Sequence, residues 1–313
     1  MSAIRLAVVG AGYMGSRHAE RAAALAARAD LELVAVADPA LARASAVAER
    51  CGVRAVADAE TLLDCCDAAI VAVPSSAHRD AVMPWLDAGR HVLVEKPIAA
   101  TVEQAEALVA AAERSGALLQ VGHLEWFNAG MQVIRDHIDR PLFAEVHRMG
   151  PFPERSTDVD VVRDVMIHDL EILQQVLGES PSRVEAIGIP VLTSNVDIAN
   201  ARLTYPGGCV ANLTASRVSP TPMRKLRFFQ KEGYFSIDFL EQSAVVFRRE
   251  PGVEGGPPRI EMEKLKVDRG DALLTQLRSF VDVVRTRKPT PASARGDGAL
   301  GALRTALQLI EAM

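Results

Sequence analysis

The sequence predicts an α/β protein: a doubly wound parallel sheet of the Rossmann type, followed by a second domain that mixes helices with a largely antiparallel sheet. Through the first 121 residues, short apolar runs alternate with alanine-rich helical stretches. Uninterrupted apolar runs are typical of strands buried on both faces, and strand–helix alternation favours right-handed crossovers and a parallel sheet. After residue 122, runs of strand type dominate. The length of 313 residues suits two domains, expected at 1–121 and 122–313, with the option that the last helix returns to the first domain.

The first domain is expected to contain strands at 4–9, 31–37, 68–73, 91–94 and 117–121, with a weaker one near 53–56. Helices are expected between them at 16–29, 41–51, 76–88 and 102–115. The last of these has clear ends: Thr101 and Gln104 form a capping box at its start, and Gly116 stands where a helix-ending glycine belongs.

In the second domain we expect a helix over 129–138, a strand over 143–149, an irregular stretch over 150–160 and a helix over 161–177 that Gly178 ends. Further strands are expected at 183–189, 199–205, 210–217, 225–230, 234–239 and 244–248. The turn signal Pro206-Gly207-Gly208 indicates that this sheet is at least partly antiparallel. A loop over 252–258 and helices over 272–286 and 298–313 complete the chain.

Composition excludes several classes of protein. Hydrophobic residues are 49% and charged residues 24%, and the net charge is −5. The absence of a basic run argues against nucleic acid as a partner, and no apolar run approaches the roughly 20 residues of a membrane helix. No signal peptide is expected. The four cysteines (Cys51, Cys65, Cys66, Cys209) show no metal-type spacing, so we expect no metal and reduced thiols in the cytoplasm.

A glycine-rich motif follows the first strand. Gly10, Gly12 and Gly15 form G-x-G-x-x-G, with Tyr13 and Met14 between the last two. Glycines there allow a tight turn and a close approach to pyrophosphate at a helix N-terminus. The alternative is a glycine-rich turn that binds nothing.

Asp38 stands 23 residues after Gly15, at the end of the second expected strand. An acid at this place accepts hydrogen bonds from a ribose 2′-hydroxyl and repels a 2′-phosphate, which favours NAD over NADP. The alternative is that Asp38 only caps the following helix.

Ligands of open α/β sheets bind at the carboxyl ends of the strands. Pro74 and Ser75 follow one such end and are expected against the cofactor, and Glu95-Lys96-Pro97 follows the next. Lys96 directly succeeds a buried run, so its ammonium can reach the cleft and stabilise a developing alkoxide or act as a base. The alternative is an ordinary surface lysine. Either isomer of the Lys96–Pro97 bond is compatible with the sequence.

The helix expected over 161–177 carries Asp164 and His168 at positions i and i+4, which places them side by side on a regular helix. An acid beside an imidazole makes a usable general base near neutral pH. An exposed pair without function is the alternative, and a zinc site is disfavoured because a third ligand is lacking.

Taken in order, Gly10-x-Gly12-x-x-Gly15, Glu95-Lys96-Pro97 and Asp164-x-x-x-His168-Asp169 resemble the glucose–fructose oxidoreductase/inositol dehydrogenase/MocA family of sugar dehydrogenases. The resemblance covers nearly the whole chain. It implies that Lys96 and His168 form the catalytic pair, that Asp164 positions the substrate or tunes its neighbours, and that Glu95 lies beside the cofactor. It also implies an open-faced second sheet used in a homodimer or homotetramer.

A narrower resemblance joins the segments 122–128, 150–155 and 165–169 to the branch that oxidises the 3-hydroxyl of UDP-N-acetylglucosamine. The chain departs from that branch where Trp126 replaces a usual arginine and Ala129 a usual proline. The substrate contacts implied or expected at the cleft are His123, Glu125, Asn128, Arg148 and Arg155, the arginines as diphosphate ligands. Surface arginines are the alternative. Other open interpretations are a dehydrogenase of inositol, another polyol or a hexose, and a non-catalytic sensor of NAD or sugar.

Overall fold

The computed structural model describes residues 3–27, 31–152, 159–252, 258–288 and 296–313. The chain forms two compact units. The first unit comprises Met1–Leu124 and Asp271–Leu300, and the second comprises Glu125–Gly270 and Gly301–Met313. The sequence-based division at residue 121 therefore differs chiefly in the segment 271–300, which belongs with the first unit.

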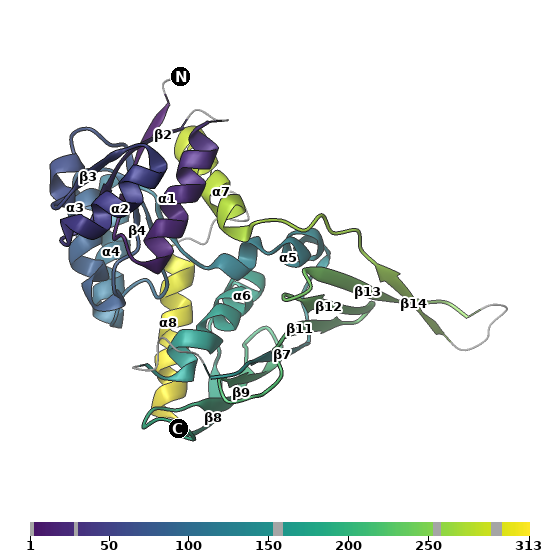
Figure 1. Ribbon diagram of the computed structural model, residues 1–313. Helices are drawn as coiled ribbons and strands as arrows, with labels where there is room; N and C mark the ends of the chain where they lie inside the picture. Colours follow the sequence, from purple (N-terminus) through teal and green to yellow (C-terminus); the bar gives the residue numbers. More distant parts are fainter. Residues whose placement is uncertain (1–2, 28–30, 153–158, 253–257, 289–295) are drawn as a thin grey trace. The chain divides into compact units, whose positions relative to one another are not determined.

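The first unit is built on a six-stranded sheet whose strand pairs are all parallel, as predicted (Figure 1). The order is β3-β2-β1-β4-β5-β6, so the direction of winding reverses between β1 and β4, which is where such sheets bind ligands. The strands are β1 (Ile4–Val9), β2 (Leu31–Ala37), β3 (Arg54–Val56), β4 (Ala68–Val71), β5 (His91–Val94) and β6 (Leu119–Val121).

The helices of this unit are α1 (Tyr13–Ala26), α2 (Leu41–Cys51), α3 (His78–Asp87), α4 (Val102–Ser115) and α7 (Ala272–Thr286). The predicted ends of α4 are confirmed: Thr101 Oγ1 accepts the Gln104 N–H at 3.3 Å, and Gly116 has φ +68°. Helix α7 lies beside α1 (Figure 1) and adds Leu277 and Phe280 to the core. That burial explains why 271–300 folds with the first unit.

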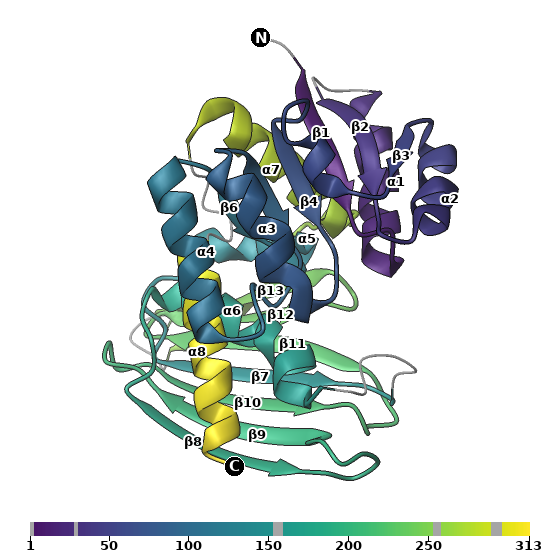
Figure 2. The same ribbon diagram turned by 90° about the vertical axis from the view of Figure 1, so that its left-hand side faces the viewer.

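The second unit contains an eight-stranded sheet in the order β14-β13-β12-β11-β7-β10-β9-β8. Figure 2 labels its strands from β7 to β13. Only β7 and β10 pair in parallel, and the other neighbours are antiparallel, which confirms the predicted, largely antiparallel sheet. The strands are β7 (Phe143–Met149), β8 (Arg183–Ile189), β9 (Ile198–Thr204), β10 (Val210–Ser216), β11 (Met223–Gln230), β12 (Gly233–Asp238), β13 (Ser243–Glu250) and β14 (Arg259–Lys264). Buried and less buried residues alternate along β7, β9 and β10, as in a sheet covered on one face.

Strand β14 was not expected from the sequence. All six of its residues are exposed, so the burial pattern that identifies a half-buried strand is missing there. Within the loop expected over 252–258, residues 253–257 lie outside the described part of the chain. The helix expected over 129–138 is shorter, with α5 (Ala129–Ile134) followed by a 3₁₀ turn over Arg135–His137.

The expectation of one regular helix over 161–177 is wrong in its first turns. Residues Val162–Met166 form a π-helical segment, and α6 (Ile167–Leu177) follows it and ends at Gly178 with φ +68°. A π turn takes in one more residue than an α turn and occurs frequently at functional sites. The i, i+4 relation of Asp164 to His168 thus crosses a change of helix type. The final helix, α8 (Gly296–Glu311), runs from the first unit into the second.

No helix among the described residues combines the length and apolar character needed to cross a bilayer.

Candidate active site

The glycine-rich loop has the shape that a pyrophosphate site requires. Gly10 has φ +95°, and a Cβ atom there would lie 2.5 Å from the Ala72 carbonyl oxygen. A Cβ atom on Gly15 would lie 1.7 Å from the Gly10 carbonyl oxygen, so both positions need glycine. Around Gly12, by contrast, the described residues leave open space within 4 Å. The loop is therefore packed where it turns and open where α1 begins, which fits a dinucleotide phosphate.

Asp38 is buried and serves this loop directly. Its Oδ2 accepts the Ala11 N–H at 2.9 Å, and its Oδ1 accepts the Ala40 N–H at 2.9 Å and an Arg43 N–H at 3.1 Å. An ionised carboxylate offers about four acceptor positions, so one is left for a ribose hydroxyl. Asp38 can therefore bind a ribose hydroxyl and also accept the N–H at the start of the following helix. The sequence analysis missed Arg43, whose side chain is 65% exposed beside the carboxylate.

The other expected cofactor residues lie around the strand ends. Tyr13 opens α1, is 56% exposed and accepts a hydrogen bond from Arg17 on its hydroxyl at 2.7 Å. Met14 follows it in the same helix. Ser75 begins a 3₁₀ turn and Pro74 precedes it, after β4.

The segment that follows β5 carries Glu95, Lys96 and Pro97. The Lys96–Pro97 peptide bond is cis. Glu95 Oε1 lies 2.7 Å from His18 Nε2, an interaction that the sequence does not reveal because the residues are 77 positions apart. Lys96 itself is half-buried. The turn that carries Lys96 is thus held by a specific side-chain contact. An ordinary surface lysine would not need such a contact.

His123 is buried close to the charge of Lys96. Its side chain is 2% exposed, and burial together with the Lys96 ammonium lowers the pKa of His123 to about 3. Neither ring nitrogen has a hydrogen-bond partner among the described residues. A neutral, buried imidazole with uncommitted nitrogens is suited to accept or donate one hydrogen bond to a bound ligand.

In the second unit, Arg148 on β7 makes a buried ion cluster. It donates two hydrogen bonds to Asp169 of α6, both of 2.8 Å, and a third to Glu125 of 2.5 Å. Burial acts to lower the pKa of Arg148, but the two carboxylates outweigh it and hold that pKa above its usual value. The guanidinium thus stays charged and ties α6, next to His168, to the sheet.

The observed hydrogen bonds change the interpretation of three expected substrate contacts, Arg148, Glu125 and Asn128. Arg148 and Glu125 are committed to one another, which argues against a direct diphosphate contact by Arg148. The buried Asn128 caps α5 by accepting the Gly130 N–H at 3.0 Å and donates to the Phe239 carbonyl at 3.0 Å. These side chains therefore support the site. Arg155 lies outside the described residues.

His168, the proposed base, and Asp164 lie at the start of the helical segment 162–177 of the second unit. Asp164 lies inside the π-helical segment and His168 in the first turn of α6, and both side chains are half-buried. The β10 strand packs against the π-helical segment. The expected pair is thus held where the helix type changes, next to the anchored Asp169.

A second buried ion pair was missed by the sequence analysis. Arg217, directly after β10, donates to Asp197 Oδ1 at 2.8 Å and to the Val159 carbonyl at 2.7 Å. Asp197 also accepts the backbone N–H groups of 191, 192 and 193. Burial opposes ionisation, but these donors hold the pKa of Asp197 well below its usual range. The pair fixes the loop before β9, from which Val196 accepts the Val161 N–H at 2.9 Å.

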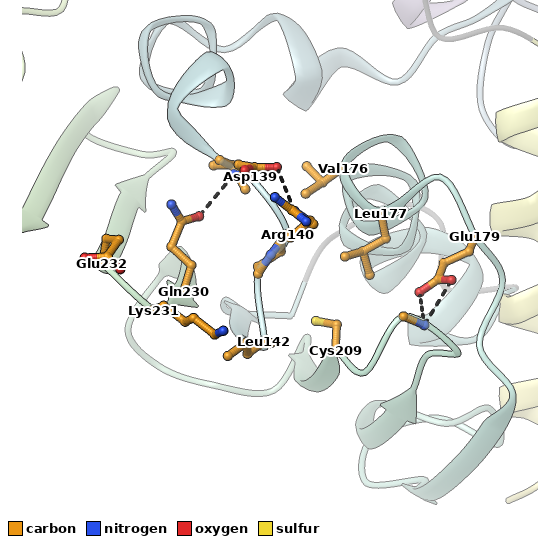
Figure 3. A pocket seen from close by; sticks show the side chains of 13 residues that line it. Asp139, Arg140, Leu142, Val176, Leu177, Glu179, Cys209, Gln230, Lys231 and Glu232 are labelled. Carbon is orange, nitrogen blue, oxygen red and sulfur yellow. Dashed lines mark hydrogen bonds and ion pairs between the residues drawn. The ribbon is translucent and has the colours of Figure 1, made fainter.

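A pocket of about 670 Å³ lies at the start of β7, within the second unit (Figure 3). Apolar side chains such as Leu142 and Leu177 line it together with Arg140 and Lys231, and none of the expected site residues takes part. We therefore do not assign the proposed chemistry to it. No cluster of three or more potential metal ligands occurs in the described part of the chain.

Comparison with known proteins identifies the family. Residues 4–123 match the family described as "Oxidoreductase family, NAD-binding Rossmann fold", and residues 133–236 match the GFO/IDH/MocA C-terminal domain. The chain belongs to this family. It is a dehydrogenase that uses NAD, in agreement with the open glycine loop and the acid at Asp38.

Two curated relatives are informative. The chain is 33% identical over 287 residues to UDP-N-acetylglucosamine 3-dehydrogenase of Acidithiobacillus ferrooxidans, covering 91% of this chain and 90% of that protein. A solved structure of that enzyme has a TM-score of 0.92, with 100% of this chain and 98% of that chain covered. The match to inositol 2-dehydrogenase of Rhizobium meliloti is 32% over 194 residues, 58% of each chain.

Proposed function

We propose that this protein is an NAD-dependent dehydrogenase that oxidises the 3-hydroxyl of UDP-N-acetylglucosamine. The observation that carries the proposal is the near full-length similarity to an enzyme of that name, combined with the presence of Lys96 and His168. The similarity to inositol dehydrogenases spans a smaller share of the chain. Inositol and other polyols are therefore the second candidates.

In this mechanism, His168 takes the proton of the sugar hydroxyl and Lys96 donates a hydrogen bond to the same oxygen. The loop from Gly10 to Gly15 and Asp38 would hold NAD, which would supply the hydride acceptor when bound. The positive charge of Lys96 stabilises the oxygen as negative charge develops on it. Asp164 orients the imidazole. Because burial and Lys96 keep His123 neutral, this residue is assigned to a hydrogen bond with the ligand.

Replacing either member of the catalytic pair tests this mechanism. Lys96→Ala and His168→Ala should each reduce turnover of UDP-N-acetylglucosamine by about two to four orders of magnitude, the usual contribution of a positioned acid or base. Turnover is followed by absorbance of the reduced cofactor, and NAD affinity is measured separately by fluorescence titration. His147→Ala is the matched control, because this histidine lies on β7 and has no assigned role. Wild-type turnover in both test variants would refute the mechanism.

The substrate is tested with a panel read in the same assay. UDP-N-acetylglucosamine should be oxidised with a higher kcat/KM than inositol isomers, free N-acetylglucosamine or hexoses. A preference for an inositol would identify an inositol as the substrate and would leave the proposed catalytic pair unchanged. NAD binding without oxidation of any member would instead favour a sensor.

We also propose a homo-oligomer formed through the less buried face of the second sheet. A row of large side chains crosses five strands there in register: Phe143, Phe229, Tyr234, Phe247 and Met262. Ring centroids along it are 5.5, 5.1 and 4.0 Å apart, and Met262 at its end is 65% exposed. An apolar patch of this kind marks a protein interface.

Analytical ultracentrifugation tests the interface. Phe247→Asp should shift the protein toward monomer, because a charge would be buried between copies. Leu41→Asp is the control, since Leu41 is 49% exposed on α2 of the other unit. An unchanged sedimentation coefficient for Phe247→Asp would refute this face as the interface.

The free cysteines are consistent with the proposed cytoplasmic location.

A further inference from the structure

Two buried histidines that the mechanism does not use contact the chain on either side of Lys96. His18 belongs to α1 and His78 starts α3, and each is 1% exposed. Their ring contacts reach Glu95 and Pro97, the residues immediately before and after the lysine. All these residues lie in the first unit.

His78 bridges the ends of two neighbouring strands. Its Nδ1 lies 2.8 Å from the Pro97 carbonyl oxygen, and its Nε2 lies 3.0 Å from the Val73 carbonyl oxygen. Val73 follows β4 and Pro97 follows β5, and these two strands pair directly. The ring therefore links the turn that carries Lys96 to the edge of the sheet where the cofactor residues stand.

The protonation of the His78 ring decides which link is a hydrogen bond. Carbonyl oxygens only accept, so a ring with one proton can donate to one of them. Burial lowers the pKa of His78, against the opposing effects of the Pro97 and Val73 carbonyls and of Glu95. The ring thus holds a single proton near neutral pH. The shorter contact, from Nδ1 to Pro97, is assigned the N–H.

The other side of the turn is fixed as well. Glu95 Oε1 contacts His18 Nε2 at 2.7 Å, and a Cβ atom on Gly122 would lie 3.1 Å from Glu95 Cα. The absence of a side chain at Gly122 lets β6 approach Glu95 closely. Lys96 therefore lies between Glu95 and Pro97, which are held by contacts with His18 and His78.

We propose that His78 is a positioning residue for Lys96, acting through the hydrogen bond from its Nδ1–H to the Pro97 carbonyl. The inference rests on the proposed function, in which Lys96 stabilises the substrate oxygen. His78 is not itself catalytic, because its ring is buried and both nitrogens face backbone carbonyls. Its effect is on where the ammonium lies, and a displacement of about 1 Å can cost about a hundredfold in rate.

Two substitutions separate the two links. In His78→Asn the amide nitrogen takes the place of Nδ1 and can still donate to Pro97, whereas in His78→Gln it takes the place of Nε2 and can donate only to Val73. His91→Asn is the matched control: His91 is a buried histidine of β5 whose Nδ1 accepts the Leu118 N–H at 2.9 Å, and an asparagine oxygen can replace that acceptor.

The first readout needs neither substrate nor NAD. The rate at which Lys96 reacts with an amine-selective acylating reagent, measured by peptide mass spectrometry, should change several-fold in His78→Gln and stay at the wild-type value in His78→Asn and His91→Asn. In turnover, His78→Gln should lower kcat by about ten- to a hundredfold with an unchanged KM for NAD, and His78→Asn should largely restore it.

Unchanged Lys96 reactivity and kcat in His78→Gln would overturn this inference and leave the proposed function standing. Equal losses in both His78 variants would overturn it too, because the Pro97 link would then not be the one that matters. If His78→Gln does not fold, ¹⁵N NMR of the wild-type ring decides: a protonated Nδ1 supports the inference, and a bare Nδ1 overturns it. Wild-type turnover in Lys96→Ala would refute the proposed function without altering the reactivity result.

Discussion

Two arginine–aspartate pairs of similar geometry lie in different surroundings in the two units. In the first unit, Arg5 donates to both oxygens of Asp67 at 3.2 and 2.7 Å, with the two side chains 41% and 33% exposed. In the second, Arg148 donates to both oxygens of Asp169 at 2.8 Å, with 5% and 2% exposed. Solvent weakens the first pair, whereas removing one partner of the second leaves a buried charge. Buried ion pairs thus hold the proposed site in the second unit.

In the first unit, contacts between side chains and backbone groups hold the glycine loop and the turn that carries Lys96, and the contact of His18 with Glu95 adds to them. Asp38 accepts the Ala11 N–H, and His78 contacts the Pro97 carbonyl. Such contacts fix a loop without burying a pair of opposite full charges. The two units should therefore respond differently to charge removal and to pH. The chain has two tryptophans, Trp85 in the first unit and Trp126 in the second, so single-tryptophan variants can report on each unit separately.

The largest effect is expected when the buried cluster is broken. Arg148→Met leaves the buried Asp169 without its hydrogen-bonded cation and Glu125 with only Arg224, 3.6 Å away, and should lower the unfolding free energy of the second unit by about 3–5 kcal/mol. Arg5→Met is the matched control in the first unit and should cost much less, because solvent screens that exposed pair. Urea unfolding, read from each tryptophan, measures both. Equal costs for the two variants would contradict the contrast drawn between the pairs.

A comparable effect is expected from pH, with opposite signs in the two units. In the first, burial lowers the pKa of His91 from 6.5 to about 4, so its stabilisation is present above pH 6.5 and is lost as the pH falls toward 4. In the second, burial raises the pKa of Glu171 from 4.5 to about 8. Its stabilisation is present below pH 4.5 and is lost as the pH rises toward 8.

At about 1.4 kcal/mol per pH unit, His91 should change the unfolding free energy of the first unit by about 3–4 kcal/mol across its window, and Glu171 that of the second by about 5 kcal/mol. His91→Asn and Glu171→Gln should flatten the corresponding dependence and leave that of the other unit unchanged. Urea midpoints at a series of pH values test this. A second unit that gains stability between pH 5 and 8 through Glu171 would contradict the expected sign.

The smallest expected effect concerns the choice of cofactor. Asp38→Ser removes the acid that repels a 2′-phosphate and leaves Arg43 beside the ribose position. We expect about a tenfold weaker affinity for NAD, the loss of about one hydrogen bond to a charged group, and a gain for NADP. Fluorescence titration with both cofactors measures the change. The double variant with Arg43→Ala is the control and should lose the gain for NADP. An unchanged preference in Asp38→Ser would show that Asp38 acts only on the loop.

The success of the sequence analysis also differed between the units, for a physical reason. The glycine loop, Asp38 and the parallel strands were predicted because their signals are local: a spacing, a strand end, an apolar run. Strand β14 was missed because its exposed residues carry no burial pattern. The π-helical segment was missed because side-chain spacing was interpreted as a regular α-helix.

The contacts of Arg148 illustrate what the residues alone do not reveal. Its partners Asp169 and Glu125 are 21 and 23 positions away, so a basic residue near the cleft was interpreted as a phosphate ligand. The same holds for His18 and Glu95, and for Arg217 and Asp197. Only the tertiary fold shows which charges are already paired.

In the proposed mechanism, Lys96 and His168 act on one substrate oxygen. The most direct test is a double-mutant cycle on kcat with saturating NAD and UDP-N-acetylglucosamine, using Lys96→Ala, His168→Ala and the double variant. We predict that the double variant is slowed hardly more than the slower single variant, because groups that act as a unit are strongly non-additive. Fully multiplied losses, or wild-type turnover in either single variant, would contradict the claim.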